Sequence, residues 1–570
     1  MMYATIDIET TGLNRFKDEI NFVGVQLNKN LYDENPKVYI FNWSDKKKRI
    51  EFVNLVNDLK GKKVKLIWQN GKFDTLFLKI KTGIMLPISD DVMLMATAYD
   101  LADKHGLKYM AQKYLGVPDW DIKNKDKLSN NADTVEPYLR CDLKYTWELY
   151  VFFKEVMDET QEKIYKRLLL PAYKTYRAVE MNGIWMNMDE YEIVREKYKR
   201  TEQEQLSKLN SRYPINWNSP QQKQKVLFTR EGENLPVLKV TPAGKPSADA
   251  SVLKRLANEG HELPKMILDY TAANTLNKMF LNRWGDDASY DGRIHPSFNL
   301  TNVVSGRTSC NDPNLQQVPR TKDVRGLFNA TDGKVFFEAD YSQLELRIAA
   351  HYAKEPTMLR IYKEDGDIHT ETAKILTGGR EPTKEERGKA KAVNFGFLYG
   401  MLAKKFIDYA YNSYGVTFSQ SEAEAYRNGF FAKYSRLLPW HKEQEELCRM
   451  LGGVPNLFGR FRKLPKIYSS SKWEQLEAIR RAINTPVQGT GSDILLSALI
   501  EVNKELSQYG LRVCGTIHDS IVGEFYEKDK DWMVDEIKRI MSHPKLLDEF
   551  GVELSVPLEA DVGVGPWGTH

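Results

Sequence analysis

Long apolar runs are missing from this 570-residue chain. A membrane-spanning helix needs about 18 consecutive apolar residues, and no such stretch occurs, so we expect no contact with a membrane. The chain opens directly into YATIDIETTG, without the basic and apolar segments of a secretory signal. The sequence therefore predicts no targeting segment and a cytoplasmic location.

Cysteine is scarce as well. The four cysteines contain no CxxC pair and lie far apart in the chain, at Cys141, Cys310, Cys448 and Cys514. This spacing argues against a disulfide scaffold and against a zinc site. We expect buried thiols in a reducing compartment.

A strong excess of charge is also absent. The net charge of +4 and the pI near 8.4 are too mild to indicate a nucleic-acid partner by themselves. With 42% hydrophobic and 11% aromatic residues, the chain can form packed cores, and its length favours several domains. Residues 380–405 alone carry seven basic and three acidic side chains. An anion-binding helix and a solvated helical face would both explain that segment.

Two acidic residues alternate with isoleucines near the N-terminus, in ATIDIETTG. Residues two apart in a strand share a face, so Asp7 and Glu9 would lie side by side while the isoleucines enter the core. Neighbouring carboxylates repel each other unless a cation, usually a divalent metal with oxygen ligands, lies between them. A solvent-facing strand edge explains this motif alone equally well.

Three further segments favour the metal interpretation. WQNGKFDTLF places Asp74 in a polar step after an apolar strand, and VEPYLRCDLKYTWELY predicts an amphipathic helix on which Tyr138 and Asp142 share a face. With HGLKYMAQKYLG at 105–116, these motifs follow the order of the DEDD-type 3′→5′ proofreading exonucleases with tyrosine, which this block resembles. The resemblance implies that Tyr138 orients an attacking water and that two Mg²⁺ or Mn²⁺ ions are held by Asp7, Glu9, Asp74 and Asp142.

A second pair of carboxylates lies at predicted strand ends in the C-terminal half. In VCGTIHDSIVGEF (513–525) the alternation predicts a β-hairpin with Asp519 at its turn. In KVFFEADYSQLELRIAAHY (334–352) an apolar strand ends at Asp340 and a helix follows. A single aspartate in a turn has a structural explanation, so the second carboxylate is what makes Asp519 a candidate metal ligand.

The segment RGKAKAVNFGFLYG places two cations and then two aromatic rings at intervals of four, at Arg387, Lys391, Phe395 and Tyr399. On a helix each step of four drifts by about 40°, so these side chains form one slowly winding stripe. Such a stripe suits a triphosphate beneath a stacked base. A basic helix that buries its aromatic residues in a core has the same pattern.

These segments resemble motifs A, B and C of the family A DNA polymerases, the DNA polymerase I group. The family's order continues in LLLPAYKTYRAVEMNGIWMN, DGRIHPSFN, SGRTSCNDPNLQQVP, DIHTETA, FGRFRKLP and RRAINTPVQGTGSDI, so the resemblance extends from residue 3 to about 568. It implies template-directed DNA synthesis from dNTPs by two-metal phosphoryl transfer, with 3′→5′ proofreading.

The resemblance also implies roles for individual residues. Asp340, Asp519 and the backbone carbonyl of Tyr341 would bind two Mg²⁺ ions, for which Mn²⁺ can substitute. Lys391 would protonate pyrophosphate, and Glu345 would exclude a 2′-OH. The dNTP would contact Gln343, Glu345, His369, Arg387, Lys391, Phe395 and Tyr399. Primer-template DNA would contact Arg307, Arg480, Asn484, Gln488 and His518, with Arg307 and Gln488 at minor-groove acceptors common to all correct pairs.

The expected fold is an α/β, RNase H-like exonuclease domain followed by an α+β right-hand polymerase. Its expected domains are the exonuclease (1–165), thumb (166–285), palm (286–352 and 475–570) and fingers (353–474). In the thumb, a long amphipathic helix should run from Met188 to Leu209, opened by Asn187 and Glu190.

The expected partners are primer-template DNA and dNTPs, and we expect a monomer. Further candidate partners are a helicase, a primase and a single-strand-binding protein, although no motif identifies them. We expect no 5′ nuclease domain. The size resembles a bacteriophage replicative enzyme acting in the host cytoplasm; a trimmed bacterial or organellar polymerase would have a similar size.

Ser520 departs from the family pattern, because most relatives have glutamate at this position. Serine favours a single-subunit RNA polymerase, whereas Glu345, Phe395 and the exonuclease block oppose it. A scaffold with dead active sites fits less well, because it should have lost its carboxylates. A nuclease alone leaves most of the motif-bearing chain unexplained. We expect position 520 to lie at the rim of the site, with Asp340 and Asp519 as the main ligands.

Overall fold

The computed structural model describes residues 1–120 and 132–568. The chain forms two compact units: unit 1 contains Met1–Asn182, Ser297–Asn311 and Glu338–Val562, and unit 2 contains Gly183–Pro296, Asp312–Phe337 and Gly563–His570. These bounds differ from the domain boundaries expected above. Helix α7 (Leu170–Asn182), which a boundary at 166 assigns to the thumb, belongs to unit 1. The four-domain division therefore stays a prediction.

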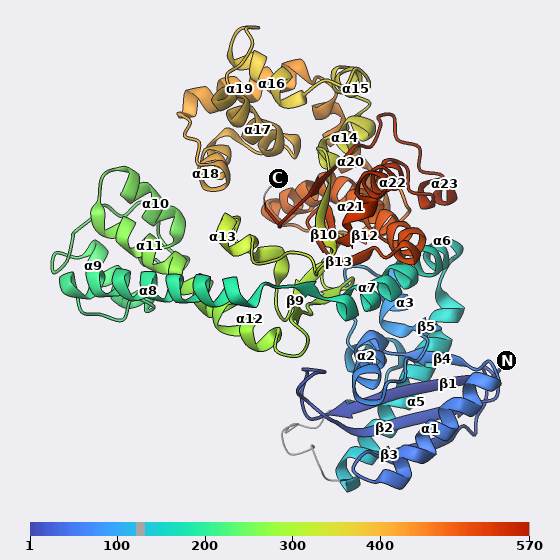
Figure 1. Cartoon of the computed structure of the whole chain (residues 1–570). Helices are drawn as coiled ribbons and strands as arrows, with labels where there is room; N and C mark the ends of the chain where they lie inside the picture. The colour runs from blue at the N-terminus through green and yellow to red at the C-terminus, as the bar shows by residue number, and fades with distance from the viewer. Residues whose placement is uncertain (121–131, 569–570) are drawn as a thin grey trace. The chain divides into compact units, whose positions relative to one another are not determined.

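The N-terminal part of unit 1 is built on a sheet of β1 (Tyr3–Thr10), β2 (Ile20–Asn28), β3 (Lys37–Asn42), β4 (Lys65–Trp68) and β5 (Asp90–Asp91). The strand order is β3-β2-β1-β4-β5; β1 is antiparallel to β2 and parallel to β4. Helix α5 (Ala132–Val156) packs on β1 and β2 (Figure 1). It approaches Gly24 so closely that a Cβ there would lie 2.8 Å from Leu139 and Leu143, which is why glycine is needed in this strand.

The helices that accompany this sheet begin with α1 (Lys46–Gly61) and α2 (Gly71–Thr82), which follow β3 and β4. The others in this part of the chain are α3 (Val92–Tyr99), α4 (Leu107–Met110) with the π-helical turn Ala111–Leu115, and α6 (Glu159–Lys163) with the π-helical segment Ile164–Leu169.

A second sheet contains β10 (Lys334–Tyr341), β13 (Arg512–Ile517), β14 (Ser520–Tyr526) and β15 (Ala560–Val564), in the order β13-β14-β10-β15. The predicted hairpin is present, since β13 and β14 are antiparallel and Ile517 pairs with Ser520 across the turn. Helix α7 packs on β13, and α21 (Lys472–Leu506) contacts β14 and α14 (Leu344–Ala353). Two further helices, α22 (Lys530–Ser542) and α23 (Leu546–Phe550), lie between β14 and β15 in the chain.

Between α14 and α21 the chain is mostly helical. Helix α17 (Lys384–Leu398), which carries the predicted stripe, begins at a capping box of Thr383 and Glu386. It packs against α14, α16 (Ile368–Leu376), α18 (Ala403–Tyr414) and α19 (Gln420–Lys433). This stretch also contains α15 (Pro356–Lys363), α20 (Leu437–Leu451) and the antiparallel pair β11 (Gly453–Pro455) with β12 (Phe461–Lys463). Earlier in the chain, β8 (Ser297–Asn299) pairs with β9 (Ser309–Asn311).

Unit 2 is mainly helical. Its long helix α8 (Met188–Arg212) confirms the predicted one and extends three residues further, and the Asn187 side chain caps it by accepting from the backbone N–H of Glu190. The other elements include β6 (Ile184–Trp185) paired with β7 (Arg293–Ile294), α9 (Pro220–Phe228), α10 (Ala250–Asn258), α11 (Glu262–Leu276), the π-helical segment Asn277–Leu281, α12 (Asn282–Asp287), the 3₁₀ turn Leu315–Gln317 and α13 (Lys322–Arg325).

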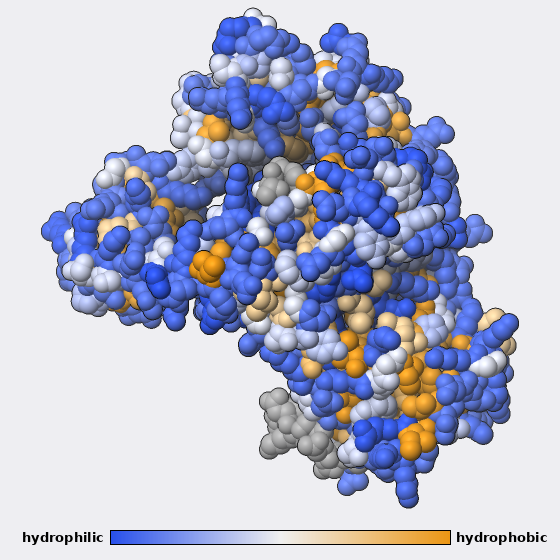
Figure 2. Space-filling view, in the orientation of Figure 1, coloured by the Kyte–Doolittle hydropathy of each residue, from blue (hydrophilic) through white to orange (hydrophobic). Residues whose placement is uncertain are grey.

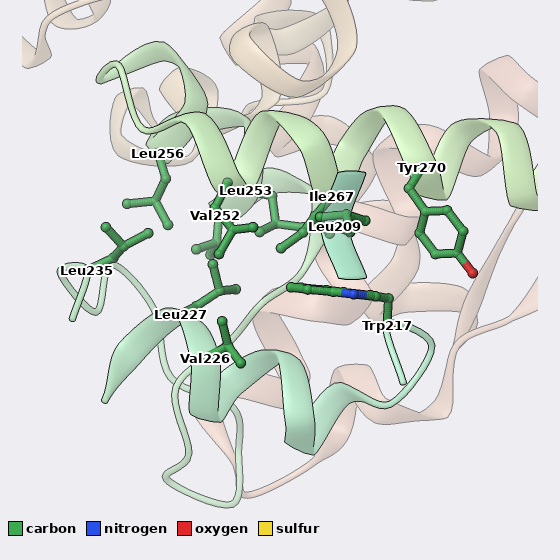
Figure 3. Close-up of a cluster of buried hydrophobic side chains, with 11 residues drawn as sticks. Leu209, Trp217, Val226, Leu227, Leu235, Val252, Leu253, Leu256, Ile267 and Tyr270 are labelled. Carbon is green, nitrogen blue, oxygen red and sulfur yellow. The ribbon is translucent and has the colours of Figure 1, made fainter. Parts of the chain in front are cut away.

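The hydrophobic core of this helical unit is shown in Figure 3. Val226 and Leu227 of α9 face Val252 and Leu253 of α10, and the large buried ring of Trp217 lies beside them, below Leu209 and Ile267 in this view. The cluster lies within unit 2, so this unit has an apolar core of its own.

The visible face of the molecule is largely hydrophilic, with hydrophobic residues in small groups (Figure 2). Among the described residues, no helix has the length and apolar character to cross a membrane.

Candidate functional site

Three of the predicted exonuclease carboxylates lie together. Candidate ligand atoms of Asp7, Glu9 and Asp142 are all within 4.8 Å of one another. Asp7 and Glu9 share a face of β1, as the alternation predicts, and Asp142 comes from α5, which packs on that strand. Oxygen ligands at this spacing suit a hard divalent cation.

Asp74 lies in the first turn of α2. The polar residues expected to follow the strand therefore form the start of a helix. Its Oδ1 accepts a hydrogen bond from the backbone N–H of Ile8 at 3.0 Å. This bond ties the beginning of α2 to the part of β1 that carries Asp7 and Glu9. Asn70 precedes the helix with a φ of 59°, a left-handed conformation that turns the chain from β4 into α2.

Electrostatics at these carboxylates favour a cation. The pKa of Asp7 is raised well above its ordinary value by burial and then by the charges of Asp74, Asp142 and Glu9. The pKa of Asp74 is also raised, mainly by burial. A bound divalent cation would compensate the repulsion among the four side chains, so the residues present fit a metal site.

Tyr138 has a neighbour that the sequence motifs did not assign. Lys108 Nζ donates to the phenol oxygen of Tyr138 at 2.6 Å and lies 4.5 Å from the ring centroid. Trp120 Nε1 donates to Asp142 at 2.6 Å. Lys108 belongs to the segment 105–116, which carries part of the exonuclease resemblance. Its position in that segment is the feature of the sequence that could have indicated a place in the site. No sequence pattern indicated Trp120.

The second pair of carboxylates lies where β10 ends against the hairpin turn. The backbone N–H of Tyr341 points toward the carbonyl of Asp519 at 3.4 Å, which brings the residue after Asp340 beside that turn. The Tyr341 hydroxyl donates to the backbone carbonyl of Met541. The candidate metal ligand of Tyr341 is therefore its backbone carbonyl rather than its side chain. Burial raises the pKa of Asp519, an effect that the positive charge of Arg307 partly offsets. His518, in the turn, has a φ of 56°.

Glu345, in the first turn of α14, is held by two donors, the guanidinium of Arg307 and the hydroxyl of Tyr399. Burial raises the pKa of Glu345 despite the nearby cation. The sequence motifs did not indicate this pairing of Arg307 with Glu345, and the DNA contact expected of Arg307 stays a prediction. Gln343 accepts a hydrogen bond from the Tyr362 hydroxyl at 3.1 Å.

The predicted stripe follows α17, with Tyr399 as the residue after the helix. Lys391 is exposed, and Arg387 donates to both oxygens of Asp367 at 2.6 and 3.2 Å. The sequence motifs did not assign Asp367, which also caps α16. Phe395 lies beside His369, with ring centroids 6.0 Å apart.

Burial lowers the pKa of His369 to about 4, so its ring is neutral at pH 7. Nδ1 lies 2.8 Å from the Asn394 amide nitrogen, which can only donate. This contact places the ring proton on Nε2.

Three predicted DNA-contacting residues follow one line along α21. Arg480 is exposed, and Asn484 and Gln488 are partly exposed, whereas most residues between and after them are buried. The Asn484 Oδ1 is buried and lacks a hydrogen-bond partner among the described residues. The structure leaves the DNA contacts of these residues, and those of Arg307 and His518, as predictions.

Ser520 is buried just after the hairpin turn, and its expected position at the rim of the metal site stays a prediction. Its side chain is only 2% exposed. The hydroxyl donates to the carbonyl of Ile517 at 2.9 Å and lies 3.3 Å from a carboxylate oxygen of Glu338.

Comparison with known proteins gives the family. A protein-family model described as DNA polymerase family A matches residues 187–569, more than half of the chain. The chain belongs to DNA polymerase family A. A model described as 3′-5′ exonuclease matches residues 2–153, the part that carries Asp7, Glu9, Asp74 and Asp142. Polymerase and exonuclease domains of this kind depend on metal ions.

Two curated relatives cover most of the chain. It is 27% identical to the DNA polymerase of Bacillus phage SP01, over 99% of this chain and 71% of the phage protein. It is 32% identical to DNA polymerase I of Pseudomonas aeruginosa, over 88% of this chain and 56% of that protein. The chain thus spans only part of the length of these relatives.

A solved structure has the same fold. The polymerase domain of Pol1 from M. smegmatis, in complex with DNA primer-template and dNTP, superposes with a TM-score of 0.82 at 23% sequence identity. The match covers 99% of this chain and 95% of that one.

Proposed function

We propose that this family A member is a DNA-directed DNA polymerase with 3′→5′ exonuclease activity. The observation that carries the proposal is the presence of two separate carboxylate sites on two sheets of one chain. One contains Asp7, Glu9, Asp74 and Asp142 on or beside β1; the other contains Asp340 at the end of β10 and Asp519 in the turn between β13 and β14.

Divalent cations are the implied cofactors, with two Mg²⁺ per site as the specific proposal. When bound, they would lower the pKa of the attacking oxygen and offset charge on the leaving oxygen. The residues that would hold them are Asp340, Asp519 and the Tyr341 carbonyl in one site, and Asp7, Glu9, Asp74 and Asp142 in the other.

In DNA synthesis, the side chains around α17 would bind and orient the dNTP. Arg387 would exchange its two bonds to Asp367 for two bonds to a phosphate, which its planar guanidinium suits. Neutral His369 would donate from Nε2 to a phosphate oxygen, and Lys391 Nζ would give a proton to the leaving pyrophosphate.

The remaining groups would select sugar and base pair. Glu345, held by Arg307 and Tyr399, would occupy the space that a 2′-OH needs. Phe395 and Tyr399 would contact the sugar and the base of the dNTP. Primer-template DNA would lie along Arg480, Asn484 and Gln488, where the Asn484 oxygen offers an acceptor.

In trimming of a 3′ end, Tyr138 would orient the attacking water. Lys108, which donates to the phenol oxygen, would hold that ring in position. The carboxylates of Asp7 and Glu9 would keep the scissile phosphate at the cation site rather than act as nucleophiles.

A labelled primer-template tests both activities. We expect extension with dNTPs, little extension with rNTPs, and progressive 3′ shortening when nucleotides are omitted and Mg²⁺ is present. Asp519→Asn should lose extension and keep shortening. A wild-type chain that extends no primer with dNTPs, or that prefers rNTPs, would overturn the polymerase proposal.

A further inference from the structure

Strand β10 carries a second acidic residue close to Asp340. Glu338 lies two positions earlier, and residues two apart in a strand point to the same face. The exposure pattern agrees, because Glu338 and Asp340 are at least partly exposed whereas Ala339 and Tyr341 between and after them are buried. The two carboxylates therefore leave the sheet on the same side.

Ser520 connects Glu338 to the hairpin that carries Asp519. The Ser520 hydroxyl lies 3.3 Å from Glu338 Oε1 and 2.9 Å from the carbonyl of Ile517. A hydroxyl has a single proton, so it serves these two acceptors in turn. Since Ser520 follows Asp519 directly, the Glu338 carboxylate lies next to the hairpin turn as well as on the strand of Asp340.

We propose that Glu338 is a third acidic residue of the polymerase site and acts on the bound cations through water. This inference rests on the polymerase function proposed above. Serine at 520 places no carboxylate after Asp519, and Glu338 supplies one from the neighbouring strand.

The role is water-mediated because of the spacing of the acids. In residues 1–120 and 132–568, the ligand atoms of Asp7, Glu9 and Asp142 all lie within 4.8 Å of one another, whereas those of Glu338, Asp340 and Asp519 do not form such a group of three. A carboxylate outside direct contact still attracts a cation and accepts hydrogen bonds from its water ligands. Changes to such outer groups weaken metal binding by about 10- to 100-fold.

The first test measures metal binding without turnover. A primer that ends in a dideoxynucleotide with phosphorothioate linkages resists both extension and trimming. On this primer-template, electron paramagnetic resonance can follow the Mn²⁺ taken up when the correct dNTP is added. For Glu338→Gln, which keeps the shape and removes the charge, we expect about tenfold weaker dNTP-dependent Mn²⁺ binding. Unchanged binding overturns the inference.

Glu527→Gln is the matched control, because it removes the same charge from an exposed position just after β14. It should bind Mn²⁺ and extend primers like the wild type. If Glu527→Gln weakens Mn²⁺ binding as much as Glu338→Gln, the effect comes from overall charge, and the inference is wrong.

The second test exchanges the two side chains. Glu338→Ser combined with Ser520→Glu moves the carboxylate from β10 to the adjacent hairpin residue, which it contacts in this structure. We expect Glu338→Ser alone to raise the Mg²⁺ concentration needed for single-turnover extension about tenfold. The double variant should need a Mg²⁺ concentration close to that of the wild type. A double variant no better than Glu338→Ser would mean that Glu338 acts through folding, and would overturn the inference.

The outcomes separate this inference from the proposed function. A wild-type chain without primer extension overturns the polymerase proposal. A wild-type chain that extends primers, together with a Glu338→Gln variant of normal Mn²⁺ and Mg²⁺ dependence, overturns only the role of Glu338.

Discussion

The ammonium group of Lys72 lies between the side-chain carboxylate of Glu180 and the backbone carbonyl of Phe298. Both charged side chains are almost fully buried, with 4% and 1% exposure. Lys72 occupies the first turn of α2, two residues before Asp74, and its backbone N–H donates to the Tyr173 hydroxyl at 3.1 Å. The start of the helix that carries Asp74 is therefore fixed by residues far along the chain.

Replacing Lys72 by methionine should be strongly destabilising. The variant removes the cation that bonds the buried Glu180 carboxylate directly and leaves Arg15, 3.8 Å away, as a weaker partner. Breaking a buried pair costs about 3–5 kcal/mol. Urea denaturation should show that loss, and 3′ shortening should fall because Asp74 shifts. Lys62→Met, which breaks the exposed pair with Asp58, is the control and should cost less than about 1 kcal/mol. Equal losses in the two variants would contradict the proposed importance of burial.

Asp7→Ala combined with Glu9→Ala should abolish 3′ shortening and spare primer extension, because the two carboxylate sites lie on different sheets. Both activities can be followed on the same labelled primer, with and without dNTPs. A parallel loss of extension would show that the two sites are not independent.

Glu345→Ala should admit ribonucleotides. The carboxylate held by Arg307 and Tyr399 is removed, and with it the proposed barrier to a 2′-OH. The measurement is the ratio of kcat/KM for a dNTP and the matching rNTP in single-nucleotide incorporation. Glu527→Gln serves as the control and should keep the wild-type ratio. If Glu345→Ala keeps it too, the assignment of the sugar-selecting residue is wrong.

Asp519→Asn and Ser520→Ala should differ greatly in single-turnover extension across a Mg²⁺ titration. Loss of a carboxylate that would bind the cation directly should lower the rate by several orders of magnitude. Loss of the Ser520 hydroxyl removes hydrogen bonds to Ile517 and Glu338 and should cost roughly tenfold or less. Should both variants be equally inactive, serine itself would be an essential ligand.

Burial of Asp91 should make the free energy of unfolding depend on pH. Burial raises its pKa from 3.8 to about 6, although backbone N–H groups such as that of Gly71 donate to it. Because the pKa of Asp91 is higher in the folded than in the unfolded state, protonation of this carboxyl stabilises the folded state. The stabilisation is fully present below about pH 4 and is lost as the pH rises through about 6.

Urea unfolding with EDTA present should therefore show a stability difference between wild type and Asp91→Asn that falls by about 3 kcal/mol from pH 4 to pH 7. The comparison cancels the titration of groups that both proteins share. A constant difference over this range would show that Asp91 titrates normally.

Local pattern alone determined several features. Alternation in residues 3–10 placed Asp7 and Glu9 on one face of a strand, the hairpin around Asp519 has its predicted turn, and α17 carries Arg387, Lys391 and Phe395 at helical intervals. These features follow from the periods of strand and helix, which adjacent residues set among themselves. The motifs also indicated the family that the comparison establishes.

Tertiary structure decided which side chains meet. Lys72 and Glu180 are 108 residues apart, Glu338 and Ser520 are 182 apart, and Arg307 reaches Glu345 rather than a partner in its own segment. Periodicity reports the face on which a residue lies but not the element that packs against that face. Those pairings depend on closure of long stretches of chain and on burial that penalises an unpaired charge, so only the folded molecule settles them.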